Sequence, residues 1–378
     1  MLTTDQCFIL SCLRESLNAE KNETAACTDK QAVGKTIIRN GILLTVFKTL
    51  PDELQQELSG RYNAAIKQAI IQEHEGTRVL RALSEAGLSC IALKGWELRK
   101  LYPEPTMRQM ADLDILVRPY DFEKIKAVMD GLGYSSGRES RWKHDSFKKR
   151  EVHVEMHKRL TDDSTAIRAW ERGMWERAKP TDGGIYKMSP EDYYIFHFVH
   201  LYKDFMNGSL GLRRIVDTWL LQKQPVDMEP VRTALETFGM WTFHERMVKL
   251  SRVTMGDEPM DENSEVLLLH AFKHGIYGSG KSYKAGRIAA MGGTVKTGKL
   301  KSKMAAVFLP YKRMKAQFPV LEKHPLLLPY CWMKRIIHFL KGNMKKNRRM
   351  LDYSDISEAD YREMKRFFEA GGALKHER

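Results

Sequence analysis

The spacing of apolar residues changes near Gly87, and this change restricts the chain to a mixed fold. Residues 1–86 carry apolar side chains at helical spacing, as at Leu43 and Val46. Short apolar runs of strand length then follow, separated by turn residues and one helical segment, before helical spacing returns beyond about residue 190. A group of strands placed between helical regions predicts an α+β fold with a small mixed sheet flanked by helices.

The individual elements follow from the same pattern. Three strands are predicted, at residues 88–93, 111–117 and 152–157. One helix is predicted before the strands, at 53–86, where it begins after Pro51 and ends at Gly87, and another at 121–131 between the second and third strands.

These elements divide the chain into four predicted regions. A helical region covers residues 1–86, a core with the sheet covers 87–180, a second helical region covers 181–342, and a charged tail covers 343–378. Residues 278–303 are rich in Gly, Lys and Ser and predict a long mobile loop. The tail is expected to fray.

The composition excludes several classes of protein. The five cysteines are scattered and form no Cys-x-x-Cys pair, which argues against a disulfide framework and against a zinc site. The chain has no run of about 18 apolar residues, which a membrane-spanning helix needs. Residues 1–5 lack the basic start of a secretory signal, so we expect a cytoplasmic protein.

The net charge of +14 is unevenly distributed. Residues 281–350 hold 18 lysines and arginines and one acid, Glu322. A surface this basic can hold RNA, the phosphates of a nucleotide or an acidic membrane surface. A solvated, lysine-rich surface is an equally good interpretation.

Two carboxylates lie within the predicted strand 111–117. Asp112 and Asp114 are two residues apart, so they share one face of the strand while Leu113 and Ile115 point into the core. Adjacent carboxylates repel each other, and a divalent cation such as Mg²⁺ removes the repulsion. A solvated pair of acids at the end of a strand is the alternative.

The strand predicted at 152–157 alternates strictly and carries Glu155 on its polar face. If it lies beside the aspartate pair, Glu155 completes a three-carboxylate site for two Mg²⁺ ions about 4 Å apart. His153 and His157 share that face, but a strand does not present two histidines as a zinc-protease helix does. We expect His157 to position Glu155 or to touch the substrate. An exposed strand with a polar outer face is the alternative.

A phosphate site is suggested where Gly95 follows a strand and opens a helix, because backbone N–H groups are free there. Lys94 adds a positive charge, and the guanidinium of Arg108 could grip a phosphate. Taken singly, a turn glycine and two surface charges explain each of them as well.

In this order, the motifs resemble the bacterial uncharacterised nucleotidyltransferase family of the DNA polymerase β-like superfamily. The matching residues of the sheet region are Leu93-Lys94-Gly95, Tyr102-Pro103, Arg108, Asp112 to Val117, Gly133-Tyr134 and Glu155-Met156-His157. The matching residues farther along are His200, Lys203, Gly211, Arg213, Asp217, Phe308 to Tyr311, Tyr330, Trp332 and Arg335. The resemblance covers roughly residues 35–342.

The resemblance implies that Asp112, Asp114 and Glu155 are catalytic metal ligands for Mg²⁺ or Mn²⁺, with Gly95 near the triphosphate. One departure is Gly95-Trp96, which stands where the superfamily has Gly-Ser or Gly-Gly, with a longer gap to the aspartates.

The helical region supplies further candidates. Lys203 and Arg213 lie on the polar sides of apolar helices and could contact base, ribose or acceptor, as could His200. The structural alternative for Arg213 is an i,i+4 ion pair with Asp217.

Residues 275–282 match the pattern GxxxxGK[ST] of a phosphate-binding loop. A phosphate-binding loop of this type follows a buried strand, whereas a helical segment precedes residues 275–282. We therefore expect at most a flexible cationic lid that contacts phosphate.

The resulting hypothesis is transfer of a nucleoside monophosphate from an NTP such as ATP to a hydroxyl or phosphate. The acceptor could be a small molecule, a peptide or RNA. Two alternatives remain: a kinase-like phosphotransferase that uses the same site, and a catalytically inactive module that binds nucleotide or RNA through residues 281–350.

Overall fold

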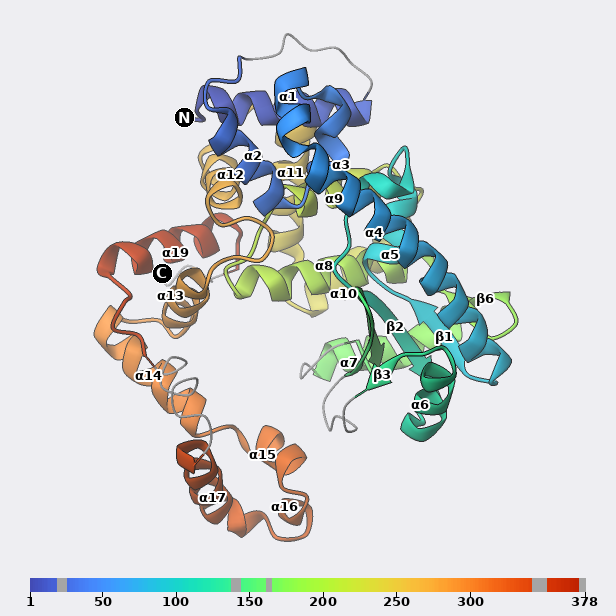
Figure 1. Ribbon diagram of the computed structural model, residues 1–378. Coiled ribbons are helices and arrows are strands. Elements are labelled where there is room, and N and C mark those ends of the chain that lie inside the picture. Colours follow the sequence, from blue (N-terminus) through green and yellow to red (C-terminus); the bar gives the residue numbers. More distant parts are fainter. Residues whose placement is uncertain (19–25, 137–143, 161–164, 342–351, 374–378) are drawn as a thin grey trace.

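The computed structural model describes residues 1–18, 26–136, 144–160, 165–341 and 352–373. Within these residues, helices surround a seven-stranded mixed sheet (Figure 1), which confirms the predicted α+β class. No helix there has both the length and the apolar character that crossing a membrane requires.

The strands are β1 (Ser89–Ala92), β2 (Leu113–Arg118), β3 (Ser135–Ser136), β4 (His144–Lys149), β5 (Val152–His157), β6 (Lys179–Asp182) and β7 (Ile185–Lys187). The helices before and around the sheet are α1 (Thr4–Asn18), α2 (Lys30–Asn40), α3 (Leu43–Val46), α4 (Asp52–Glu85), α5 (Gly95–Leu98), α6 (Phe122–Gly131) and α7 (Thr165–Arg177). The later helices are α8 (Pro190–Met206), α9 (Leu212–Gln222), α10 (Met228–Thr237), α11 (Trp241–Met255), α12 (Glu262–His274), α13 (Gly280–Ala290), α14 (Val295–Val307), α15 (Tyr311–Gln317), α16 (Val320–Lys323), α17 (Leu328–Lys341) and α19 (Glu358–Ala370).

The strand order is β3-β4-β5-β2-β1-β7-β6. The central pair, β2 and β5, runs parallel, with Asp114 directly beside Glu155. The two acidic strands are therefore neighbours, which meets the condition for a three-carboxylate site. All three predicted strands form within one or two residues of their expected bounds.

Helices cover both faces of the sheet. Val79 and Leu83 of α4 pack with Leu113 and Ile115 of β2 on one face. Leu116 of β2 faces the other side, in a cluster that includes residues of α7 and α8. Because side chains alternate along a strand, Asp114 lies on the same side as Leu116, toward the helices that follow the sheet.

The long helix α4 confirms the prediction for residues 53–86. It starts directly after Pro51, and Gly87 ends it with a φ of +72°, a conformation that glycine adopts without strain. Gly76 has a second role, because a Cβ there would lie 2.4 Å from the ring of Trp96. Trp96 is thus used to pack α5 against α4, which accounts for a tryptophan after Gly95.

Residues 278–303 were predicted to be a mobile loop, but the structure has helices there, α13 and most of α14. Each helix starts with a reciprocal capping box, Ser279 with Ser282 and Thr294 with Thr297. Ile288 of α13 is fully buried. Glycine and lysine dominate the composition of this segment, so the prediction missed its helix caps and its narrow stripe of apolar residues.

The tail was predicted to fray, but residues 358–370 form α19. Its Tyr361, Met364, Phe367 and Phe368 are buried in the large helical core, at spacings of three and four residues. The charged residues of the tail occupy the opposite face. The rest of the predicted tail before residue 352 and after residue 373 lies outside the described residues.

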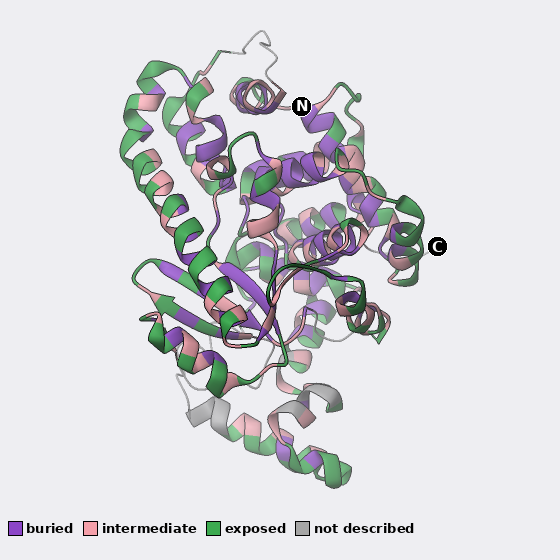
Figure 2. Ribbon diagram, turned by 90° about the vertical axis from the view of Figure 1, so that its right-hand side faces the viewer, coloured by how far each residue is buried: buried purple, intermediate pink, exposed green. Residues whose placement is uncertain are grey.

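The helices of the N- and C-terminal parts share one core, which includes Phe8 of α1, Phe205 of α8 and Phe368 of α19. Helices α14 to α17 extend away from it (Figure 1) and are largely exposed in Figure 2. A small cluster around Met314 and Leu321 holds α15 to α17 together.

Candidate active site

The three predicted carboxylates meet at the junction of β2 and β5. Asp112 immediately precedes β2, Asp114 is its second residue, and Glu155 lies in β5. One oxygen from each of the three lies within 4.8 Å of the other two. The parallel register brings them together, because it sets Asp114 beside Glu155.

Asp114 makes the shortest ionic contacts in this group. Its side chain is 2% exposed, and its Oδ1 lies 2.6 Å from Nζ of Lys94 and 2.7 Å from Nε2 of His157. Burial alone would raise the pKa of the Asp114 carboxyl, but the bonds to His157 and Lys94 outweigh it and hold this pKa below its usual range. Asp114 is therefore ionised and ready to bind a cation.

Asp112 shows the opposite shift. Burial, followed by the neighbouring charge of Asp114, raises the pKa of the Asp112 carboxyl, and Glu155 adds to the effect. Hydrogen bonding to His157 lowers the pKa of the Glu155 carboxyl, so Asp112 is the carboxylate whose charge the neighbouring cations do not offset. An all-oxygen donor set with excess negative charge suits Mg²⁺ or Mn²⁺, so these residues fit a divalent cation.

His157 is buried between two of the carboxylates. Its Nε2 lies 2.7 Å from Asp114 and 3.5 Å from Oε2 of Glu155. Burial lowers the pKa of His157, yet hydrogen bonding to Asp114 and Glu155 raises it above its usual value. The contact with Glu155 agrees with the positioning role predicted for His157.

His144 of β4 was missed by the sequence analysis. The antiparallel register places it beside His157, and its Nε2 lies 3.5 Å from Oε1 of Glu155. His144, Glu155 and His157 form a second group with metal-binding donors within 4.8 Å of one another. His153, considered in the sequence, is exposed instead.

The segment before α5 brings Lys94 to the carboxylates. Lys94 has a φ of +42°, which is strained for a residue with a side chain. The Tyr193 hydroxyl of α8 donates a hydrogen bond to the Lys94 carbonyl at 2.7 Å and helps to hold this conformation. Gly95 follows in a tight space, since a Cβ would lie 2.6 Å from Nη1 of Arg108.

Arg108 makes a different contact from the one expected for a free phosphate clamp. Its Nε and Nη2 bond to the two carboxylate oxygens of Asp217 at 2.7 and 2.8 Å, and both side chains are buried. Tyr102 donates a hydrogen bond to the same carboxylate at 2.9 Å. Asp217 thus pairs with Arg108 and not with Arg213, the partner considered as the structural alternative, because α9 turns Asp217 toward the segment before β2.

Arg213 instead donates from Nη1 to the carbonyl of Gln109. It is buried, and its Nε has no hydrogen-bond partner among the described residues. Burial lowers the pKa of the Arg213 guanidinium to about 10. A buried guanidinium with a free N–H is suited to an anion.

These groups line a cavity of about 340 Å³, a size typical of small-molecule sites. Lys94, Gly95, Arg108, Asp112 and Asp114 form one side. The other side includes His200, Asp204, Arg213, Arg214 and Tyr277. The structure thus brings Asp112 and Asp114 together with Arg213 of α9, while Glu155 and His157 contact the aspartates from outside the cavity lining.

Lys203 is exposed and is not part of the cavity lining. Asp204, Arg214 and Tyr277 line the cavity but were missed, because nothing in their local sequence distinguishes them from surface residues. Asp204 contacts His200 at 3.3 Å and also pairs with Arg214.

The segment 275–282 follows a helix and not a strand, as expected. Its Lys281 pairs with Asp360 of α19 at 2.9 Å, so its ammonium is directed to α19. Only Ile276 and Tyr277 of this segment reach the cavity.

A family model described as "uncharacterised nucleotidyltransferase" matches residues 19–256. The match includes the three carboxylates and Arg213, and ends before α12. The C-terminal motifs from Phe308 to Arg335 lie outside it. Neither the curated proteins nor the solved structures contain a match to this chain.

Proposed function

Because the chain belongs to this uncharacterised nucleotidyltransferase family, we propose that it transfers a nucleoside monophosphate from an NTP to an acceptor hydroxyl or phosphate. The observation that carries the proposal is the group of three carboxylates, Asp112, Asp114 and Glu155, of which the two aspartates line a cationic cavity. Phosphoryl-type transfer needs little beyond positioning and charge neutralisation, and this arrangement supplies both.

The carboxylates would hold Mg²⁺ or Mn²⁺. A bound divalent cation supplies charge neutralisation at the attacking oxygen and at the leaving pyrophosphate. His157 would orient Asp114 and Glu155, since it contacts both. The ammonium of Lys94, which pairs with Asp114, would also attract the phosphates of the bound NTP.

Arg213 is the strongest candidate for binding a phosphate of the NTP. It is buried, carries an N–H without a partner among the described residues, and faces the same cavity as Asp112. Gly95 would let the chain approach a phosphate closely. Arg108, held by Asp217, would keep the wall of the cavity in place and present its remaining nitrogen.

The proposal is tested by thermal unfolding with each of the four NTPs, with and without Mg²⁺. A ligand present at about 100 times its Kd adds roughly 2.7 kcal/mol of stability. We expect a Mg²⁺-dependent increase in Tm that Asp112→Asn/Asp114→Asn loses and that Arg213→Gln weakens. Lys203→Ala is the matched control, because Lys203 is a cation of the same region outside the cavity.

A product analysis then separates the related reactions. An NMP-modified acceptor with pyrophosphate supports nucleotidyl transfer, while a phosphorylated acceptor with NDP supports the kinase-like alternative. Acceptors are screened as pools of small molecules, peptides and RNA. If no NTP raises Tm and RNA binding weakens steeply with salt, the inactive binding module is favoured.

A further inference from the structure

A third cluster of potential ligands lies between α12 and α19, away from the proposed active site. His270 and His274 are four residues apart on α12 and share one face of the helix. Glu363 of α19 faces them, and one donor atom from each of the three lies within 4.8 Å of the others. The cluster lies outside the residues that match the family model.

The surroundings of His270 fix the orientation of its ring and the position of its proton. Its ring is 4% exposed and stacks on Phe367 with a centroid distance of 3.6 Å. Its Nε2 lies 3.2 Å from the carbonyl oxygen of Gly208, which can only accept a hydrogen bond. The proton is therefore on Nε2, and Nδ1 keeps its lone pair.

That Nδ1 atom is buried and has no hydrogen-bond partner among the described residues. A buried, unsatisfied acceptor is costly unless something binds it. A metal-binding histidine typically donates its other N–H to a carbonyl or carboxylate, which is the arrangement that Gly208 provides here.

The other two donors lie close by. Nε2 of His274 is 3.1 Å from Oε1 of Glu363, and the rings of His270 and His274 are 4.4 Å apart. Donor atoms on tetrahedral Zn²⁺, at ~2.0–2.1 Å from the metal, lie roughly 3.4 Å from each other. The donor atoms of His274 and Glu363 are already close to this separation. Side-chain rotation can bring the donor atom of His270, which lies within 4.8 Å of both, to a similar distance.

We propose that His270, His274 and Glu363 bind one transition-metal cation of the Zn²⁺ class. Two imidazole nitrogens and one carboxylate oxygen suit such a cation better than Mg²⁺, which prefers oxygen ligands alone. Three protein ligands leave a fourth position for water or another small ligand.

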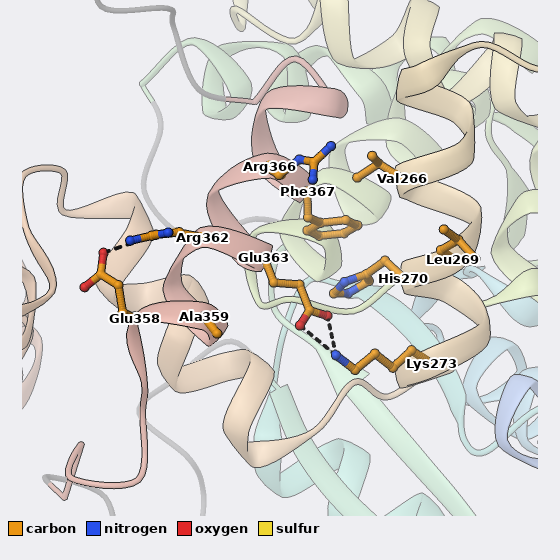
Figure 3. Close-up of a pocket in the computed structure, with 10 residues that line it drawn as sticks. All are labelled: Val266, Leu269, His270, Lys273, Glu358, Ala359, Arg362, Glu363, Arg366 and Phe367. Atoms are coloured by element: carbon orange, nitrogen blue, oxygen red, sulfur yellow. Dashed lines mark hydrogen bonds and ion pairs between the residues drawn. The ribbon is translucent and has the colours of Figure 1, made fainter. Parts of the chain in front are cut away.

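The surroundings of the cluster fit this assignment. His270 and Glu363 line a cavity of about 580 Å³ between the two helices, and Figure 3 shows them on facing walls. Lys273 bonds to both oxygens of Glu363, at 2.6 and 2.8 Å. Because its side chain is 59% exposed, Lys273 can move aside when a cation binds. The bound metal would crosslink α19, near the C-terminus, to α12.

The test uses the full-length protein, stripped with a chelator and then titrated with Zn²⁺ against a chromogenic chelator. It is carried out in the Asp112→Asn/Asp114→Asn background to reduce binding at the proposed active site. His144, Glu155 and His157 remain in this background, so the expected result is a difference: His274→Ala and Glu363→Gln should each bind one equivalent of Zn²⁺ fewer than the parent. Co²⁺ in place of Zn²⁺ should give the intense visible absorption of a four-coordinate site, and His274→Ala should reduce this absorption by the share of one site.

Lys273→Gln is the matched control for Glu363→Gln. It removes the same ion pair with Glu363 but no proposed ligand, so it should retain the bound equivalent. Circular dichroism checks that each variant is folded. An equal stoichiometry in His274→Ala, Glu363→Gln and their parent would overturn the proposal, as would an absence of Zn²⁺ binding in the parent. Neither result affects the proposed nucleotidyl transfer, which is assayed with the intact aspartates.

Discussion

Arg108 and Asp217 form a buried, two-point ion pair that joins the segment before β2 to α9. Nε and Nη2 of Arg108 lie 2.7 and 2.8 Å from the two oxygens of Asp217. The two residues are 109 positions apart in the chain. Through this pair, the helix that carries Arg213 is held at a defined position over Asp112 and Asp114.

Asp217→Asn should lower the free energy of unfolding by about 3–5 kcal/mol, because it leaves the Arg108 guanidinium buried without a counter-charge. Urea denaturation measures the change. Replacing both partners, as in Arg108→Met/Asp217→Leu, should recover much of the loss, since no unpaired charge remains. The exposed pair Arg232–Glu236 supplies the control, and Glu236→Gln should leave the transition unchanged. Equal losses in the single and double variants would contradict this account.

Asp112 should contribute to activity at the expense of stability. Asp112→Asn should reduce NMP transfer by roughly 1000-fold, equivalent to ~4 kcal/mol of barrier. The same change should raise the Tm measured without metal. Burial and Asp114 raise the pKa of Asp112, so its ionised form is disfavoured in the folded state at neutral pH. A lower Tm in Asp112→Asn, measured by calorimetry after chelation, would argue against this electrostatic account.

Gly95→Ala should impair the site through sterics alone. The new Cβ would lie 2.6 Å from Nη1 of Arg108 and 2.7 Å from the sulfur of Met110, so one wall of the cavity must shift. We expect a higher KM for the NTP and a weaker NTP-induced rise in Tm. Gly60→Ala in α4 is the control, because its Cβ would meet no atom within 4 Å. That change should leave KM unaltered and raise stability by ~0.5–1 kcal/mol. An unchanged KM in Gly95→Ala would remove the assigned role of Gly95.

The start of α12 should show a pH-dependent contribution from Asp261. The side chain accepts a hydrogen bond from the backbone N–H of Ser264 at 2.8 Å and pairs with Lys249 at 2.7 Å. Burial opposes the charged form, but these bonds outweigh it and lower the pKa of Asp261 to about 2. A lowered carboxyl pKa stabilises the fold above the unfolded pKa of ~3.9, and the contribution is lost as the pH falls through 2.

Asp261→Asn is the suitable variant, because asparagine caps a helix as well as aspartate does and only the charge is removed. The parent should be more stable than Asp261→Asn at pH 7. The difference in unfolding free energy should shrink below pH 4 and vanish near pH 2. Urea titrations across that range measure it, and a difference independent of pH would show that the charge is irrelevant.

Local pattern was sufficient for the central elements. Strict alternation in residues 152–157 predicted β5, and Pro51 with Gly87 predicted the limits of α4. The same alternation put Asp112 and Asp114 on one face. These features depend on backbone sterics and on side-chain period, which act within a few residues of the chain.

The segments predicted to be mobile show where that reasoning fell short. In α13, α14 and α19 the charged and glycine residues outnumber the apolar ones that matter, so composition hid the helical period. Packing against the shared core stabilises α13 and α19 more than intrinsic propensity does. The N-cap residues Ser279, Thr294 and Ser357 mark the N-termini of these three helices in the sequence.

The sequence by itself determined three of the seven strands, β1, β2 and β5, together with the long helix and the paired carboxylates, because each depends on neighbouring residues. Only the tertiary structure decided that Arg108 binds Asp217, that Arg214 and Tyr277 enter the cavity, and that Lys203 stays outside it. The same holds for His270, which faces Glu363 of a distant helix. The physical reason is that an ion pair or a shared cavity requires side chains to meet in space, and the packing of whole helices sets which ones do.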